Sequence, residues 1–296
     1  MPGKTEKTRN QGRLLRHGRY LHGAAMGTLG FCTSWAVDHT GHGREWIEVE
    51  QLDLRLRNLP DKLRGRRIVH ISDLHMSRIV SMKYLRRCVG RVNELDADIV
   101  ILTGDYITHD RSGEYRQKAV KLIGDIKSHY GVYACLGNHD YGMIHSTHPG
   151  RDGLLEDLVD GMTENGVRLL RNKSAAVQIN GRCLWLVGLG DLWVGDFKPD
   201  KAFADVPAKE AVIALSHNPR GIERLGAYPV EAVMSGHTHG ARRSWSLSGG
   251  LTRNYRRFHA GMYDVAGRKL YVNRGLGRLG RARLNARPEI TVLTLR

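Results

Sequence analysis

Residues 66–105, RRIVHISDLHMSRIVSMKYLRRCVGRVNELDADIVILTGD, contain the pattern that recurs through most of the chain. The runs at 66–72 and 98–104 are short and apolar, and the second is rich in β-branched residues, as buried strands are. Between them, residues 81–95 place apolar side chains on one face at helical spacing, with Ser81 positioned as an N-cap. A strand, a helix and a strand in succession predict an α/β fold.

The alternation of strands and helices continues to the end of the chain. Helices are predicted at 114–130 and at 154–166, where Gly166 would close the second one. Further strands are predicted at 46–59, 131–137, 167–170, 175–179, 183–189, 211–215, 230–235, 269–273 and 289–295. Because no repeat, low-complexity tract or linker interrupts residues 46–296, we expect one domain there, preceded by a distinct segment at 1–45.

This N-terminal segment combines a basic flank with a mildly apolar stretch at 20–37. The order is typical of a signal-anchor sequence. However, His22 and several glycines interrupt the stretch, and a membrane-spanning helix needs roughly 20 strongly apolar residues. Three interpretations stay open: a weak signal-anchor or interfacial helix, a basic arm, and a cleaved export signal.

The chain carries 46 basic and 30 acidic residues, a net charge of +16. This surplus predicts an anionic partner, whether nucleic acid, a phosphate-rich substrate or an acidic membrane face, and it points to no protein partner. The four cysteines are widely spaced without a CxxC pair, which indicates reduced thiols rather than a disulfide framework. We therefore expect a cytoplasmic protein, peripherally attached to a membrane or anchored by its N-terminal segment, with export left open.

Metal-binding side chains follow five of the predicted strands. Because sites in α/β sheets form at the carboxyl ends of strands, these side chains are expected to converge. They are Asp73, His75, Asp105, Asn138, His217, His237 and His239. A set of carboxylates, an amide and imidazoles without a thiolate suits manganese, iron or zinc.

Seven ligands are too many for one ion. They suit two cations about 3.5–4 Å apart that share one carboxylate, an arrangement used for phosphoester cleavage. Asp105 is the predicted bridge, since it ends the most apolar strand.

The ordered motifs "DLH", "GD", "GNHD", "SHN" and "GHTH" resemble those of the calcineurin-like metallophosphoesterase superfamily, over roughly residues 46–296. Stretches such as "DADIVILTGDYI" and "ALSHNPRGIE" are similar to a bacterial branch with membrane-associated phosphodiesterases and a UDP-2,3-diacylglucosamine pyrophosphatase. The resemblance implies a four-layer sandwich of two mixed β-sheets flanked by helices.

The resemblance also implies roles for individual residues. One metal would be held by Asp73, His75, Asp105 and His239, and the other by Asp105, Asn138, His217 and His237. A hydroxide bridging the two metals would attack phosphorus. His139 would contact the phosphate and protonate the leaving oxygen, and Asp140 would orient its imidazole.

One departure concerns the substrate. The related branch usually continues its last motif as glycine-glycine-glutamine, whereas this chain has Gly240, Ala241 and Arg242. We expect a cationic rim that binds a diphosphate or lipid head group and an anionic bilayer. Its predicted members are Arg242, Arg243, Arg274 and Arg278. The glycine-rich residues 275–280 are expected to form a tight loop near the active face.

Three classes of function follow from these patterns. The first is a two-metal hydrolase of phosphodiester or pyrophosphate bonds, acting on UDP-2,3-diacylglucosamine or a related lipid head group, as in lipid A biosynthesis. The second is a nuclease or cyclic-nucleotide phosphodiesterase that uses the basic surface, and phosphomonoesterase activity stays open beside it. The third is a non-catalytic binding module, which the complete set of ligands disfavours.

Overall fold

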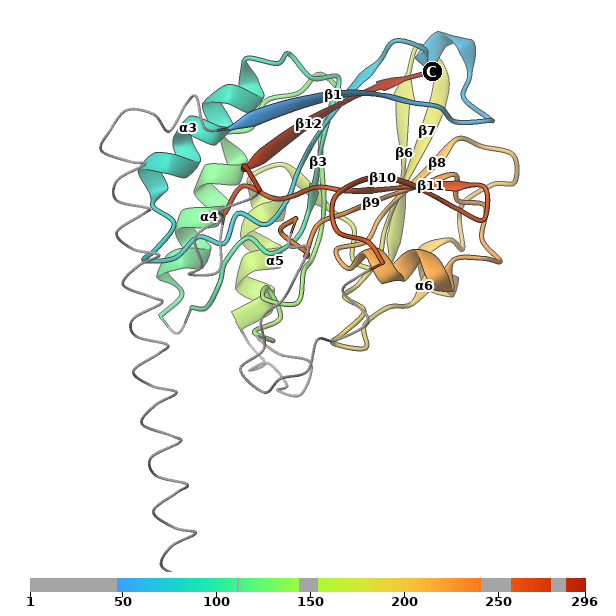
Figure 1. The fold of residues 1–296 in the computed structure, drawn as a ribbon. Coiled ribbons are helices and arrows are strands. Elements are labelled where there is room, and N and C mark those ends of the chain that lie inside the picture. The colour runs from blue at the N-terminus through green and yellow to red at the C-terminus, as the bar shows by residue number, and fades with distance from the viewer. Residues whose placement is uncertain (1–46, 111, 144–153, 241–256, 278–285) are drawn as a thin grey trace, which may run out of the picture.

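The computed structural model describes residues 47–110, 112–143, 154–240, 257–277 and 286–296. In this part of the chain the strands form two six-stranded sheets that pack face to face (Figure 1). The N-terminal segment 1–45 and the predicted rim residues Arg242, Arg243 and Arg278 lie outside the described residues.

The first sheet is mixed. Its strands, in spatial order, are β1 (Glu48–Leu54), β12 (Glu289–Leu295), β2 (Arg67–Ile71), β3 (Ile99–Thr103), β4 (Val132–Cys135) and β5 (Val167–Leu169). Only the β12–β2 pair is antiparallel. The strands β2, β3 and β4 are therefore parallel, and their carboxyl ends meet at one edge of the sheet.

The second sheet is also mixed. Its order is β10 (Gly261–Val265), β11 (Arg268–Val272), β9 (Ala232–Ser235), β8 (Val212–Leu215), β7 (Arg182–Gly188) and β6 (Lys173–Ile179). The two outer pairs are antiparallel, whereas β7, β8, β9 and β11 run parallel. These two mixed sheets confirm the predicted fold class.

Helices cover the outer face of the first sheet: α3 (Met82–Asn93), α4 (Glu114–Gly124) and α5 (Leu154–Glu164). Ser81 caps α3 as predicted, since its side chain accepts a hydrogen bond from the Tyr84 amide at 3.3 Å. The outer face of the second sheet has a thinner cover, which includes the short α6 (Pro199–Ala202) and the 3₁₀ helix η2 (Pro219–Arg224). Another 3₁₀ turn, η1 (Asp61–Leu63), belongs to the apolar cluster between the sheets.

Three expectations about the elements need correction. The strand expected at 46–59 ends at Leu54, because the amides of Arg57 and Asn58 bond the Glu231 carboxylate, at 2.5 and 3.1 Å, instead of a neighbouring strand. The helix expected at 114–130 ends at Gly124, because the Asn93 side chain bonds the Asp125 carbonyl and the Lys127 amide, each at 2.9 Å, and fixes a turn there. The strand β10 was not predicted. It is a half-exposed edge strand joined to β11 through Ala266 and Gly267, which both have positive φ.

Within the described part of the chain, we find no helix with the length and hydrophobicity needed to span a membrane.

Candidate metal centre

The ends of β2, β3 and β4 in one sheet and of β8 and β9 in the other carry all seven predicted metal ligands. Three overlapping groups have ligand atoms within 4.8 Å of one another. The groups are Asp73, His75 and His239; His75, Asp105 and His139; and Asp105, His217 and His237. Two sheets thus contribute to one cluster of carboxylates and imidazoles.

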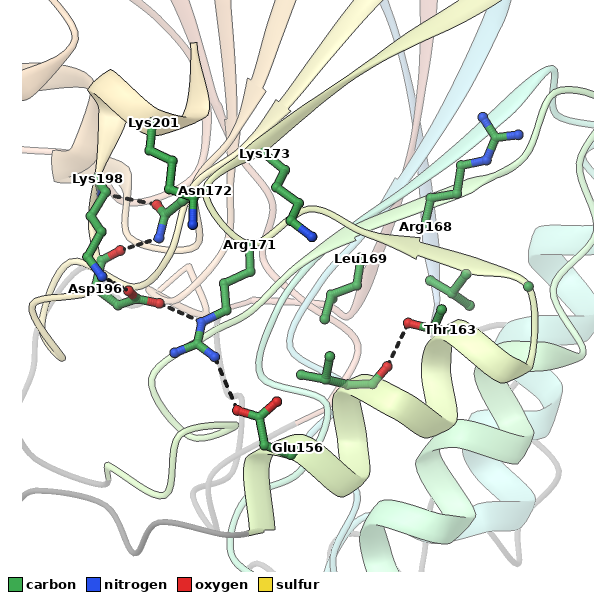
Figure 2. A pocket seen from close by; sticks show the side chains of 13 residues that line it. Glu156, Thr163, Arg168, Leu169, Arg171, Asn172, Lys173, Asp196, Lys198 and Lys201 are labelled. Atoms are coloured by element: carbon green, nitrogen blue, oxygen red, sulfur yellow. Dashed lines mark hydrogen bonds and ion pairs between the residues drawn. The ribbon is translucent and has the colours of Figure 1, made fainter. Parts of the chain in front are cut away.

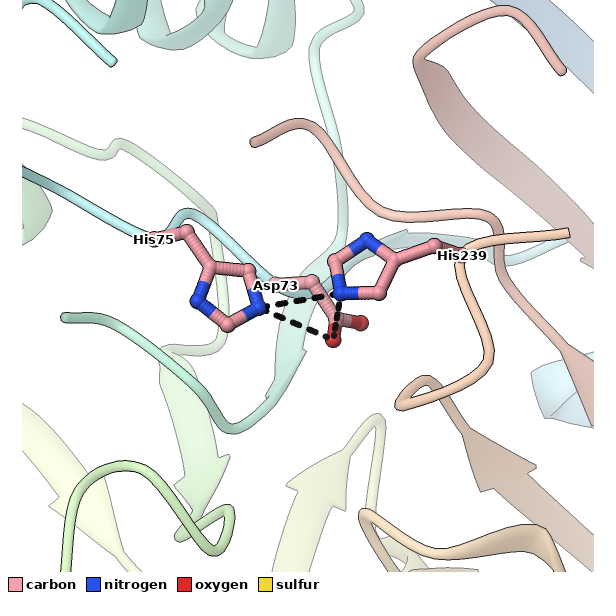
Figure 3. A group of neighbouring side chains, drawn as sticks. All are labelled: Asp73, His75 and His239. Carbon is pink, nitrogen blue, oxygen red and sulfur yellow. Dashed lines mark hydrogen bonds and ion pairs between the residues drawn. The ribbon is translucent and has the colours of Figure 1, made fainter. Parts of the chain in front are cut away.

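The first group is shown in Figure 3. Nε2 of His75 lies 3.0 Å from Nε2 of His239, and Asp73 Oδ1 lies 3.7 and 3.4 Å from these two nitrogens. Ligands at about 2.1 Å from one ion are separated from each other by about 3–3.5 Å. The spacing of this group therefore fits a single cation.

The second group surrounds His217. Its Nε2 lies 3.1 Å from Asp105 Oδ2 and 3.2 Å from His237 Nδ1, and its Nδ1 donates to the Thr103 carbonyl at 2.6 Å. That backbone bond holds the ring with Nε2 toward the cluster, as partners of metal-binding histidines commonly do.

Asn138 offers an oxygen at the end of β4. Its Nδ2 donates to the Met143 carbonyl at 2.8 Å, which fixes the orientation of the amide. Its Oδ1 is buried and has no hydrogen-bond partner among the described residues. A buried acceptor without a donor is costly, and a bound cation would satisfy it.

Asp105 lies between the first and the second group. Its Oδ2 lies 3.5 Å from His75 Nε2 and 3.1 Å from His217 Nε2, while its Oδ1 accepts the His139 amide at 2.9 Å. This position between the groups is the one expected of a shared carboxylate.

The cluster is electrostatically coupled. Burial alone lowers the pKa of His217, but the attraction of Asp105 and Asp73 outweighs it and raises that pKa to about 10. Burial likewise disfavours the charged form of Asp105, yet His217 and His139 hold its pKa well below the usual range. Burial and the neighbouring His217 lower the pKa of His237 to about 3. Among these groups, His217 is therefore the one whose protonated form the surroundings favour.

His139 is oriented by the backbone. Its Nδ1 donates to the Thr108 carbonyl at 2.8 Å, so Nε2 is the nitrogen left for the cluster. The ring lies edge to face with that of His75, with centroids 4.9 Å apart.

The expectation that Asp140 orients this imidazole is wrong. The buried Asp140 carboxylate accepts the amides of Gly137, Asp105 and Tyr106, each at 2.8 Å. Burial and the charge of Asp105 raise the pKa of Asp140 to about 7, against the effect of the amide donors. Asp140 ties the turn after β3 to the turn after β4.

Two residues of the site were missed in the sequence. The loop after β7 places the Trp193 ring edge to face on His237, with centroids 4.3 Å apart. It also buries Asp191, whose charge raises the pKa of His217 and whose Oδ2 has no hydrogen-bond partner among the described residues. The sequence signal was a strand followed by glycine and aspartate, the same order as Gly104 and Asp105.

The predicted substrate ligand Arg274 has carboxylate partners within the fold. It pairs with Glu48 at 3.0 Å, with Glu50 at 3.1 Å and with Glu289. Its charge is therefore compensated, and we do not retain it in the proposed rim. The following residues 275–277 do form a tight loop against the site, since the amides of Leu276 and Gly277 bond the carbonyls of Ser72 and Asp73.

Comparisons with known proteins identify the family of the chain. Residues 66–241 match the model of the calcineurin-like phosphoesterase family. The chain is 30% identical to "Phosphodiesterase YaeI" of Escherichia coli, with 84% of this chain and 88% of that protein aligned. It is 31% identical to "UDP-2,3-diacylglucosamine pyrophosphatase LpxG" of Chlamydia muridarum, over 83% and 88% of the two chains. It is also 29% identical to "Uncharacterized metallophosphoesterase YkuE" of Bacillus subtilis, over 84% and 86%. With a family match across more than half of its length, the chain belongs to the calcineurin-like phosphoesterases and is a metal-dependent hydrolase.

Proposed function

We propose that this protein is a two-metal hydrolase that cleaves phosphodiester or pyrophosphate bonds. The observation that carries the proposal is the pair of ligand groups that share Asp105. Asp73, His75, Asp105 and His239 would hold one cation, and Asp105, Asn138, His217 and His237 the other. The absence of a thiolate from this set favours manganese, iron or zinc.

When bound by these residues, two cations would supply an activated water for attack at phosphorus and would neutralise charge on the phosphoryl oxygens. The remaining work falls to the side chains of the site. With Nδ1 held by the Thr108 carbonyl, His139 can carry a proton on Nε2 and donate it to the leaving oxygen. Trp193 contacts His237 edge to face and would form an apolar part of the wall beside it.

The proposed substrate is UDP-2,3-diacylglucosamine or a related lipid head group, which would give the enzyme a role in lipid A biosynthesis. Support comes from the 31% identical pyrophosphatase and from the net charge of +16, which suits a diphosphate at an anionic membrane surface. We propose a cytoplasmic location, with peripheral membrane association through the basic N-terminal segment and the arginines at 242, 243 and 278.

A substrate panel tests this proposal. Protein reconstituted with manganese is incubated with UDP-2,3-diacylglucosamine, an aryl phosphodiester, an aryl phosphomonoester and single-stranded DNA. We expect the lipid diphosphate to give the highest kcat/KM. Hydrolysis of DNA with a steep salt dependence would instead favour a nuclease. No turnover of any substrate by fully loaded protein would overturn the assignment as a hydrolase of these bonds.

A further inference from the structure

A polar cleft lies apart from the metal centre, beside the last strand of each sheet. β5 is the last strand of the first sheet and β6 the last strand of the second, and a cavity of about 700 Å³ opens between them and α5 (Figure 2). This volume is in the range of small-molecule sites.

The cleft carries more positive than negative charge. Its lining includes five cationic side chains and only two carboxylates, Glu156 and Asp196. The cations are Arg168, Arg171, Lys173, Lys198 and Lys201. The lining thus has a net charge of +3, which is five minus two.

Both carboxylates of the cleft are already engaged. Asp196 accepts Arg171 Nε at 2.7 Å and lies 3.1 Å from Lys198 Nζ, and Glu156 lies 3.4 Å from Arg171 Nη1. Lys173, Lys201 and Arg168 form no ion pair among the described residues. Arg168 donates instead to the Tyr133 hydroxyl at 2.8 Å. Three cations thus remain to attract an anion.

One wall of the cleft is held rigidly. The buried Asn172 accepts the amides of Gly190 and Lys198 at 2.9 and 3.0 Å and donates to the Asp196 carbonyl at 2.7 Å. The loop between β7 and α6 is therefore fixed where it carries Asp196 and Lys198. Because this wall is already ordered, less conformational entropy is lost when a ligand binds.

The same loop connects the cleft to the metal centre. It packs Trp193 on the ligand His237 and, three residues later, places Asp196 in the cleft. Tyr141, which follows the GNHD motif, donates to Asp196 Oδ2 at 2.8 Å. The Arg171 guanidinium lies over the Tyr141 ring, 5.2 Å from the ring centroid. A ligand in the cleft would sit beside the active site without touching its metal ligands.

We propose that this cleft is an accessory site for a phosphate group, separate from the scissile phosphate of the reaction. Guanidinium and ammonium groups around an open cavity recognise phosphate oxygens, and no metal is required. Two sources share this chemistry: the head group of an anionic membrane lipid and a free phosphorylated metabolite. The site does not depend on the proposed hydrolysis, so the two can fail separately.

Lysine footprinting tests the proposal at the site itself. Metal-loaded full-length protein is treated with an acetylating reagent, and the modification rate of each lysine is read by mass spectrometry. The probes are glycerol phosphate, phosphatidylglycerol vesicles and phosphatidylcholine vesicles. We expect a phosphate probe to slow the acetylation of Lys173 and Lys201 but not of the exposed Lys121 and Lys127, which lie outside the cleft.

The probes distinguish the two sources. Protection by glycerol phosphate indicates a free metabolite, and protection by phosphatidylglycerol vesicles alone indicates a lipid head group. The double variant K173E/K201E should weaken probe binding by at least about tenfold, because two charge-assisted contacts are reversed. The matched variant K121E/K127E should leave it unchanged. No protection by either anionic probe, or equal protection of all four lysines, would overturn the proposal.

Discussion

At the scale of single residues, five of the seven proposed ligands share an unusual backbone conformation. Asp73, His75, Asp105, His237 and His239 all have φ between 48° and 72°, the left-handed region. Such a conformation costs a non-glycine residue on the order of 1–3 kcal/mol and persists where the surroundings enforce it, often at active sites.

The proton donor can be tested by one substitution. His139→Asn should lower kcat/KM by about 10²–10⁴-fold for a diester with a poor leaving group, because protonation of the leaving oxygen is lost. The loss should be smaller for a nitrophenyl diester, whose leaving group needs less protonation. Metal content by elemental analysis should not change. An equal loss on both substrates would contradict the role of His139 as an acid.

Loading of the cluster should release protons. The pKa of His217 is raised from 6.5 to about 10, so at pH 7 a cation must displace a proton from this ring. The free proton concentration falls as pH rises, so displacing the proton costs less and apparent metal affinity should increase between pH 6 and pH 9. Calorimetric titrations at pH 7 in buffers of different ionisation enthalpy should report about one proton released per His217 site filled. His237, with a pKa of about 3, should add none.

At the scale of elements, the site depends on turns that are tied together. Asp140 joins the turns after β3 and β4 through three backbone amides. Asp140→Asn replaces an acceptor oxygen by a donor and leaves at least one buried amide unpaired, at a cost of about 1–3 kcal/mol. We expect a lower free energy of unfolding in urea together with weaker metal binding. The exposed Asp157→Asn on α5 is the control, and it should change neither quantity.

The two sheets also meet closely through a glycine. A Cβ at Gly236 would lie 1.9 Å from Ser72 Oγ and 2.2 Å from Asp73 Oδ2. Gly236→Ala should therefore push the β2 and β9 loops apart, destabilise the protein by about 1–3 kcal/mol and lower metal occupancy. Gly226→Ala meets nothing within 4 Å and should be neutral. Full metal occupancy in Gly236→Ala would contradict the proposed dependence of the site on this contact.

Features that depend on residues close together in the sequence could be predicted, whereas features that depend on distant residues could not. Strands and their terminal ligands were predicted because apolar runs and the polar residues after them are local patterns. The end of α4 at Gly124 was not predicted, since it depends on Asn93, which lies in the preceding helix α3. The ion pairs of Arg274 could not be predicted for the same reason, because Glu50 lies 224 residues away in the sequence. Trp193 was missed because its contact with His237 joins two loops that are far apart in the sequence, one after β7 and one after β9.

At the scale of the whole molecule, the charge of +16 should govern where the enzyme acts. Surface charges act over about 10 Å at 0.1 M salt. They therefore attract an anionic membrane or lipid substrate but not a small neutral leaving group. The apolar residues between the two sheets are buried, so they cannot distinguish substrates by charge. Selection by charge must therefore come from surface cations.

The arginines after the last metal motif are the ones that we expect to select the lipid substrate. The double variant R242E/R243E should raise KM for UDP-2,3-diacylglucosamine in anionic vesicles by at least about 30-fold, because each basic residue contributes about 1 kcal/mol near such a surface and the two glutamates would also be repelled. KM for a small aryl phosphodiester should change little, since the proposed metal ligands are intact. K121E/K127E carries the same change of charge on α4 and the segment after it and serves as the control. If R242E/R243E raised KM equally for both substrates, the arginines would act on the metal centre itself, and the proposed rim would be rejected.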